Sequence, residues 1–305
     1  MQTKQQIQKL LTSAGTSVSK RLGQHFLIDL NLMRLLIASA NINSNDIVLE
    51  VGCGTGSLTQ AIAEHAGKTI AVEFDRKLAE IAERQLTGKK NVQTINTDIL
   101  ENKNTINPTI LCAIESARKK HSGKFLLVAN LPYNTACPVI LNLVAGPLVA
   151  DAMYVTVQKE VASRMTATSG SKHYGTLSIF LTATGDVKTI RILKPTVFWP
   201  APKVDSAMVS FIRDKRKASR IKNMELLSEL VAFFMGHRRK TLIACTKLAH
   251  RKFVKANRFR SVSEINNWPE IFEQCSIDPH KRPEKLSPED YIAVTNLCCE
   301  ALNKI

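Results

Sequence analysis

A glycine-rich turn stands at residues 50–56, where the sequence reads EVGCGTG directly after a short β-branched run. Glycines between a strand and a helix let the backbone approach a ligand closely and leave the helix N-terminus free to meet it. Gly52, Gly54 and Gly56 have the spacing G-x-G-x-G, and Ser57 stands where the dinucleotide fingerprint has its third glycine. We therefore expect these glycines to bind S-adenosylmethionine, a ligand without phosphate groups, rather than NAD.

Two acidic residues follow the next two predicted strands. Glu73 ends the apolar stretch 69–73, a position from which a carboxylate accepts the hydroxyl protons of a bound ribose. Asp98 follows the strand-like stretch 92–95, and its carboxylate is suited to accept from the amino group of an adenine. Taken alone, each acid is also explained as a helix cap or an exposed loop residue. Together with the glycine turn, both are expected to bind the cofactor.

The string Asn130-Leu131-Pro132-Tyr133 ends a predicted buried strand and is suited to chemistry on an adenine amine. That amine is a poor nucleophile because its lone pair is delocalised into the ring. The side-chain oxygen of Asn130 and the carbonyl of Leu131 can accept its two hydrogens, which points the lone pair at a methyl sulfonium. Pro132 stiffens the turn, and Tyr133 offers a face on which an extruded base stacks. The alternative is a proline-containing turn with a surface tyrosine.

A second aromatic wall for the base is expected from residues 198–204, which read FWPAPKV. In this interpretation Phe198 faces Tyr133 across the extruded base. The alternative is ordinary core packing of Phe198 beside a proline-rich turn.

These residues need a sheet that brings their strand ends together. Apolar runs alternate with helical patterns through the first two thirds of the chain, which predicts βαβ units, right-handed crossovers and a mostly parallel sheet. Ligands on such a sheet bind beyond the carboxyl ends of the strands. Gly52, Glu73, Asp98 and Asn130 all fall at such ends.

Other segments are less regular. Residues 152–157 and 176–181 are predicted as later strands, and residues 102–123 as a surface insertion that contains a short amphipathic helix at 110–120. After residue 213 the sequence shows helical spacing and no convincing strand. We therefore predict two domains. Residues 1–213 form a Rossmann-like, S-adenosylmethionine-binding catalytic α/β domain, and residues 214–305 form a small all-α domain.

The chain resembles the KsgA-type small-subunit rRNA adenine dimethyltransferases nearly from end to end. The matching blocks are residues 21–27, 50–56, 130–134, 157–160, 174–175, 198–207, 238–242 and 282–287. The resemblance implies transfer of two methyl groups to each of two adjacent adenosines near the 3′ end of small-subunit rRNA. It also implies a monomer, a helical domain that docks rRNA and a role in ribosome maturation. It assigns cofactor binding to His25, Leu27, Gly52, Glu73, Asp98 and Asn130.

Two positions depart from the pattern of that family. His25 stands where asparagine is common, and Thr176 follows Tyr174 and Gly175 where a basic residue is frequent. The second departure implies one RNA contact fewer.

The charge of the chain favours a polyanionic partner. The 42 Lys and Arg residues against 26 Asp and Glu residues give a net charge of +16. Residues 213–260 hold 15 of the basic residues and three acidic ones. One such cluster is also explained as a solvated face, but the surplus extends over the whole chain, which favours nucleic acid. We expect Lys203, Arg238, Arg239 and Lys240 to contact RNA.

The seven cysteines have no metal-ligand spacing, and the sequence shows neither a signal peptide nor an apolar run of the roughly 18 residues that a membrane span needs. We expect a cytoplasmic enzyme with free thiols, no metal and no membrane contact.

Three other functions stay open on the sequence alone. A resistance methylase acting on large-subunit rRNA shares the glycine turn and the Asn-x-Pro-Tyr loop, although the blocks at 198–206 and 282–287 favour the small subunit. An RNA-binding assembly or transcription factor could retain the fold without the chemistry, although Gly52, Glu73 and Asn130 are intact. An NAD-dependent oxidoreductase is disfavoured because no acid or base for hydride transfer stands out.

Overall fold

A computed structural model describes residues 1–19, 22–103, 105–249 and 259–302. The chain forms two compact units. The first contains Met1–Ala162 and Val187–Ile212, and the second contains Ser163–Asp186 and Arg213–Ile305. The predicted boundary after residue 213 lies one residue from the observed division. Residues 163–186, which the sequence pattern places in the first domain, belong to the second unit.

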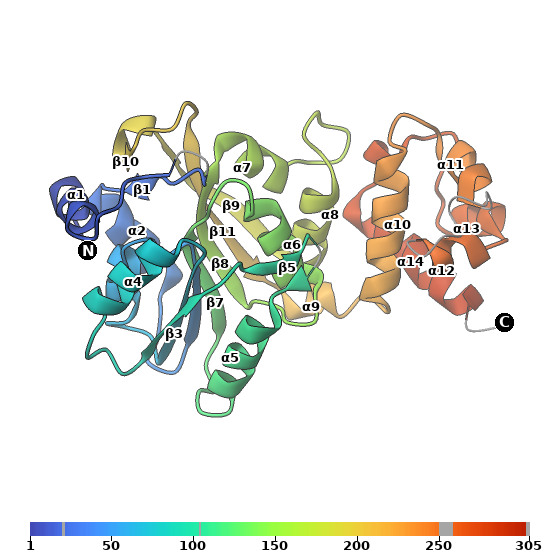
Figure 1. The fold of residues 1–305 in the computed structure, drawn as a ribbon. Coiled ribbons are helices and arrows are strands. Elements are labelled where there is room, and N and C mark those ends of the chain that lie inside the picture. The colour runs from blue at the N-terminus through green and yellow to red at the C-terminus, as the bar shows by residue number, and fades with distance from the viewer. Residues whose placement is uncertain (20–21, 104, 250–258, 303–305) are drawn as a thin grey trace. The chain divides into compact units, whose positions relative to one another are not determined.

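The first unit is built on a seven-stranded sheet with the order β4-β3-β2-β7-β8-β11-β9 (Figure 1). Its strands are β2 (Ile47–Val51), β3 (Lys68–Glu73), β4 (Val92–Asn96), β7 (Phe125–Asn130), β8 (Ala152–Gln158), β9 (Gly185–Leu193) and β11 (Ser206–Arg213). Neighbouring strands from β4 to β8 are parallel, and β11 runs antiparallel to β8. The mostly parallel sheet is thereby confirmed.

Helices cover the sheet in the manner of a doubly wound fold. Helices α3 (Ser57–Ile62) and α4 (Arg76–Gln85) connect β2 to β3 and β3 to β4, after which α5 (Pro108–Arg118) and α6 (Ala136–Ala145) lead to β7 and β8. Since such crossovers are right-handed, the reversal after β4 puts α3 and α4 on one face and α5 and α6 on the other. The strand order reverses between β2 and β7, where ligands bind in folds of this kind.

The remaining elements before residue 213 lie outside the seven-stranded sheet. They are α1 (Lys4–Ser13), β1 (Phe26–Leu27), α2 (Leu30–Ala40), β5 (Leu100–Asn102), β6 (Thr105–Ile106), α7 (Lys159–Met165), α8 (Thr176–Thr184), η1 (Pro195–Val197) and β10 (Phe198–Trp199). Of these, α8 and the end of α7 belong to the second unit. Strand β1 pairs antiparallel with β10, which fixes residues 26–27 beside residues 198–199.

Residues 102–123 are not a surface insertion, because they contain the crossover helix α5. Pro108 stands in its first turn, and the side chain of Asn107 caps its N-terminus. Ile110 and Ile114 are fully buried, and α5 packs against β2 and β3. The predicted amphipathic helix is correct, but its apolar face covers the sheet.

Residues 176–181 form the helix α8 rather than a strand. Nearly every residue of α8 is buried, so its apolar run shows neither a helical nor an alternating period. The hydroxyl of Ser178 accepts from the backbone N–H of Gly175 at 3.0 Å, which caps the start of the helix. The strand β9 begins only where α8 ends.

The second unit is helical after residue 213, as the sequence predicts for the described residues. Its elements there are α9 (Lys215–Ala218), α10 (Met224–Gly236), α11 (Leu242–Ala249), α12 (Arg260–Glu264), α13 (Trp268–Gln274), η2 (Pro283–Lys285) and α14 (Pro288–Leu302). The rings of Phe233, Phe234 and Trp268 are in contact in its core. None of the helices in the described part of the chain is long and apolar enough to cross a membrane.

The position of α5 can be tested by its contribution to stability. We expect Ile114→Ala to lower the free energy of unfolding by roughly 2–5 kcal/mol, because a fully buried isoleucine leaves a cavity. Ser116→Ala, an exposed change on the same helix, should stay within about 0.5 kcal/mol. Denaturant titrations of the two variants make the comparison. Equal small effects would mean that α5 lies on the surface.

Candidate active site

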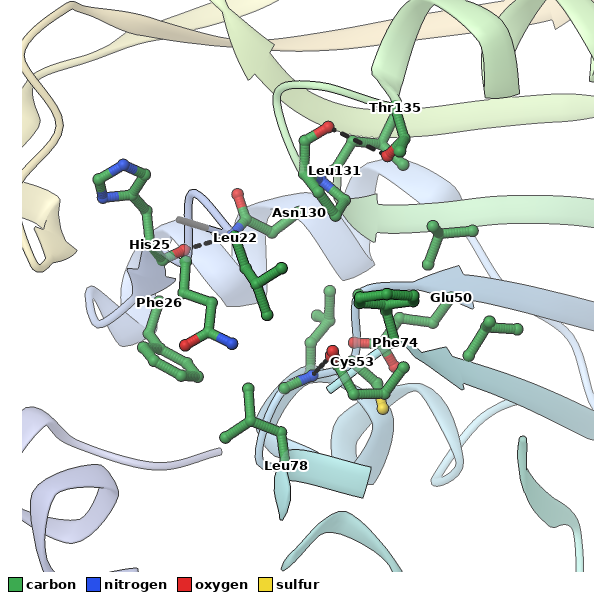
Figure 2. Close-up of a pocket in the computed structure, with 18 of the residues that line it drawn as sticks. Leu22, His25, Phe26, Glu50, Cys53, Phe74, Leu78, Asn130, Leu131 and Thr135 are labelled. Atoms are coloured by element: carbon green, nitrogen blue, oxygen red, sulfur yellow. Dashed lines mark hydrogen bonds between the residues drawn. The ribbon is translucent and has the colours of Figure 1, made fainter. Parts of the chain in front are cut away.

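A cavity of about 280 Å³ opens at the carboxyl ends of β2, β3, β4 and β7, next to the reversal of strand order. The four predicted strand-end positions, Gly52, Glu73, Asp98 and Asn130, all line it. His25, Leu27, Gly54 and the loop residues 131–133 line it as well, and Figure 2 shows the labelled members of this lining. Gly56, by contrast, is the N-cap of α3 with a φ of +80°.

The backbone path of the glycine turn depends on two positions where a side chain does not fit. Gly52 and Gly54 have φ values of +76° and +59°. A Cβ on Gly52 would lie 2.9 Å from Cγ of Pro132, and a Cβ on Gly54 would lie 2.9 Å from the ring of Phe26. Any other residue would therefore be strained and would collide. The turn can touch both the 130–133 loop and strand β1 only as glycine.

Glu73 connects β3 to the glycine turn. Its Oε2 accepts from the backbone N–H of Gly54 at 2.8 Å, and its Oε1 accepts from that of Asp75 at 2.9 Å. Burial raises the pKa of Glu73, and these two backbone donors act in the opposite direction. Each carboxylate oxygen keeps a lone pair for a further donor. The group is thus held in place and can still accept from the hydroxyls of a ligand.

Asp98 lies at an exposed position on the cavity lining, in the turn between β4 and β5. Its Oδ1 accepts from the backbone N–H of Leu100 at 3.0 Å. Asp98 therefore caps a local turn, as expected of an exposed loop residue, and it also lines the cavity.

The loop after β7 has its side chains held by hydrogen bonds. The Nδ2 of Asn130 donates to the carbonyl of His25 at 2.8 Å (Figure 2). The hydroxyl of Thr156 donates to the side-chain oxygen of Asn130. The hydroxyl of Tyr133 lies 2.8 Å from the hydroxyl of Ser206. Both the amide and the aromatic ring therefore have fixed partners on neighbouring segments.

The ring of His25 lies beside that of Tyr133, with centroids 5.4 Å apart and planes tilted by 32°. Its Nδ1 is 2.6 Å from the carbonyl of Pro200. Asn130 is bound by the backbone of His25, so this contact does not depend on which side chain stands at position 25.

Phe198 does not form a wall of the cavity. It is 3% exposed and belongs to the core cluster of Leu27 and Val48, and its partner in the β1–β10 pair is Leu27. Its neighbour Trp199 stacks on Phe26 at 6.2 Å. The core-packing alternative is therefore the correct one for Phe198 in this structure, and the ring beside Tyr133 belongs to His25.

Three features in or next to the cavity were not predicted from the sequence. Phe74, directly after Glu73, is a 59% exposed aromatic side chain on the lining. Gln2 is buried and bonds to the glycine turn from outside: its backbone N–H donates to Ser57 Oγ at 2.7 Å, and its side-chain oxygen accepts from the hydroxyl of Thr55 at 2.6 Å. An aromatic residue directly after a predicted strand could have indicated Phe74 from the sequence. The contacts of Gln2 join residues more than fifty positions apart, so no local pattern predicts them.

The third feature is Glu50, a buried carboxyl at the start of the glycine turn. It is 2% exposed, and its Oε2 has no hydrogen-bond partner among the described residues. Burial raises the pKa of Glu50 to about 8. The nearby hydroxyl of Thr59 acts in the opposite direction, and the charge of Glu73 acts in the same direction as burial. A positive charge nearby would favour the ionised form of this buried carboxyl, so this wall of the cavity is suited to a cationic ligand.

The predicted RNA contacts lie on exposed or partly exposed positions. Lys203 belongs to the first unit, and Arg238, Arg239 and Lys240 belong to the second. Lys203, Arg239 and Lys240 are exposed. The guanidinium of Arg238 contacts Oε2 of Glu284 through Nε at 2.9 Å and Nη2 at 2.8 Å. Arg238 therefore has a structural partner, and the other three residues are the better candidates.

Known proteins are similar to this chain over most of its length. A family model described as ribosomal RNA adenine dimethylase matches residues 15–274. A relative from Bifidobacterium adolescentis, named ribosomal RNA small subunit methyltransferase A, is 36% identical over 302 residues, covering 94% of this chain and 91% of the relative. A relative of the same name from Staphylococcus aureus is 34% identical over 289 residues, covering 95% and 92%.

Two solved structures are similar as well. A dimethyladenosine transferase from Plasmodium falciparum superposes with a TM-score of 0.70 at 25% identity, covering 92% of this chain and 98% of that chain. The 23S rRNA methyltransferase ErmE has a TM-score of 0.58 at 19% identity, covering 89% and 98%. The second likeness shows that the two proteins share a fold.

The raised pKa of Glu50 predicts a pH-dependent stability. The carboxyl titrates at about 8 in the folded protein, against an ordinary value of 4.5. The folded state thus binds more protons between these values, so stability falls as the pH rises from about 4.5 to 8. We expect Glu50→Gln to raise the Tm of the ligand-free protein more at about pH 8.5 than at about pH 5. Glu101→Gln, at an exposed position, is the control, and a gain independent of pH would contradict the assignment.

Proposed function

The chain belongs to the ribosomal RNA adenine dimethylase family and is therefore an rRNA adenine methyltransferase, and on this premise we propose its substrate, cofactor and site. It transfers two methyl groups from S-adenosylmethionine to each of two adjacent adenosines near the 3′ end of small-subunit rRNA. The observation that carries the proposal is the pair of acceptors at the end of β7, the side-chain oxygen of Asn130 and the carbonyl of Leu131, directly beside the glycine turn. The names of the relatives support the small subunit as substrate.

The cavity residues fit S-adenosylmethionine. The buried carboxyl of Glu50, whose Oε2 has no hydrogen-bond partner among the described residues, matches a cationic ligand, and Glu73 keeps an acceptor site on each oxygen for ribose hydroxyls. Gly52 and Gly54 bring the backbone to the ligand, and Asp98 accepts from its adenine. When bound, S-adenosylmethionine supplies a methyl carbon made electrophilic by the positively charged sulfur.

The protein contributes orientation and electrostatic matching. Asn130 and Leu131 accept the two hydrogens of the target amine, which localises its lone pair on nitrogen. Tyr133 stacks on the extruded base, and its hydroxyl is fixed by Ser206. No strong general base is needed, because the amine becomes acidic only as the methyl group arrives. Pro132 holds the loop against Gly52.

The proposed function also includes the rRNA partner, the oligomeric state and the cellular compartment. Residues 1–213 carry the catalytic site, and residues 214–305 dock rRNA on the assembling small subunit. The enzyme works as a monomer in the cytoplasm, without a metal ion. The positive charge of the chain, +16, supports a polyanionic partner.

The reaction is tested by incubating the protein and S-adenosylmethionine with purified unmethylated subunits and analysing the nucleosides by mass spectrometry. We expect dimethyladenosine in small subunits and none in large subunits. Asn130→Ala should lower the rate by roughly 100- to 1,000-fold, since it removes one electrostatic contact to the reacting amine. Asn31→Ala, an exposed change on α2, should not. Methylation of the large subunit alone would replace the proposed substrate, and unchanged methylation by Asn130→Ala would overturn the site.

The RNA contacts are tested by the salt dependence of binding to small subunits. Replacing Arg239 and Lys240 by Ala should reduce the slope of log affinity against log salt by roughly 0.7–0.9 for each phosphate that the protein no longer neutralises. Lys119→Ala with Lys120→Ala removes the same charge from an exposed pair at the end of α5 and is the matched control. Equal slopes for the two double variants would mean that only net charge matters.

A further inference from the structure

Thr156 is a buried hydroxyl residue of β8 that stands directly opposite Asn130 in the sheet. The two are register partners of the parallel pair β7–β8, and Thr156 is 1% exposed. We propose that Thr156 is a positioning residue for methyl transfer, because it holds both acceptors that face the target amine. This inference rests on the proposed function and adds a residue that acts through Asn130 and Leu131.

Thr156 contacts the 130–131 loop twice. Its hydroxyl donates to the side-chain oxygen of Asn130, and its carbonyl accepts from the backbone N–H of Leu131 at 3.1 Å. The first contact fixes the side-chain acceptor, and the second fixes the peptide that precedes the carbonyl acceptor. One residue therefore sets the position of both groups.

The orientation of the Asn130 amide follows from its two partners. The carbonyl of His25 can only accept, so the group that faces it at 2.8 Å must be the NH₂ of Asn130. The oxygen then points to the Thr156 hydroxyl, which is able to donate. The amide is held at both ends, by β8 on one side and by the segment before β1 on the other.

This orientation matters because the reaction needs an acceptor at that place. The last torsion of an asparagine side chain is broad and roughly two-fold, so an unrestrained amide can present its NH₂ instead of its oxygen. Two donors would then face each other, and the lone pair of the target amine would not be localised. An amide oxygen has two lone pairs, so the bond from Thr156 leaves one for the amine.

A β-branched residue is suited to this task. Branching restricts the first torsion of threonine, which keeps the hydroxyl aimed at Asn130. Serine keeps the donor with more rotational freedom, and valine keeps the shape without the donor. A comparison of threonine, serine and valine at position 156 therefore distinguishes the effect of the hydrogen bond from the effect of side-chain packing.

The decisive experiment compares Thr156→Val and Thr156→Ser. We expect Thr156→Val to lower kcat for dimethyladenosine formation by roughly 10- to 100-fold, because the acceptor is no longer held in place. The KM for small subunits and the Kd for S-adenosylhomocysteine should change by less than about two-fold, and Thr156→Ser should retain kcat within about three-fold.

Thr69→Val is the matched control. It removes a buried hydroxyl from β3 that has no hydrogen-bond partner among the described residues, so kcat should be unchanged. A double-mutant cycle then tests whether Thr156 acts through Asn130. In the Asn130→Ala background, Thr156→Val should cause no further loss of activity.

The outcomes separate this inference from the proposed function. Wild-type protein that makes no dimethyladenosine would overturn the function itself. Wild-type kcat in Thr156→Val, or a further decrease in the Asn130→Ala background, would overturn the role of Thr156 alone. A decrease of kcat in Thr156→Ser as large as in Thr156→Val would also do so, because the donor is still present. If Thr156→Val does not fold, Thr156→Ala is measured against the same criteria.

Discussion

The close approach of Gly52 to Pro132 is the constraint on which the site depends. A Cβ at position 52 would lie 2.9 Å from the proline ring, so only a glycine lets the turn after β2 touch the loop after β7. The first segment is proposed to hold the methyl donor and the second to hold the acceptor amine. Methyl transfer needs these two partners in contact, because the attacking nitrogen must lie close to the methyl carbon and in line with the bond that breaks. Because Gly52 has no side chain, the turn after β2 and the loop after β7 can lie in contact.

The same cavity concentrates acidic groups where water has little access. Burial raises the pKa of Glu50, and it raises that of Glu73 as well. It also raises the pKa of the Cys53 thiol well above its ordinary value, with the charge of Glu50 as the next cause. Cys53 is therefore an uncharged part of the wall rather than a nucleophile. Carboxyls that are costly to ionise in the free protein become favourable once a cation faces them, because both charges then lie in a low dielectric.

In the second unit, three sequence blocks that are far apart along the chain contact one another. The hydroxyl of Tyr174 donates to the carbonyl of Leu286 at 2.8 Å, and that of Tyr291 donates to the carbonyl of Pro283 at 3.0 Å. Arg238 pairs with Glu284 in the same segment. The blocks at 174–175, 238–242 and 282–287 thus stabilise one another through hydrogen bonds and an ion pair. Part of the family pattern in this unit is structural.

The sequence alone determined the features that depend on local order along the chain. Glycine spacing, apolar runs and residues at strand ends predicted the parallel sheet and the meeting of Gly52, Glu73, Asp98 and Asn130. These predictions hold because the carboxyl ends of parallel strands lie at one edge of the sheet. Tertiary structure decided what depends on contact through space. It buried Phe198, put α5 on the sheet and made residues 176–184 helical, since burial on all sides removes the periodic signal. It also left Oε2 of Glu50 without a partner among the described residues and set the partners of Gln2 and Thr156, because hydrogen bonds between strands and loops depend on which segments become neighbours.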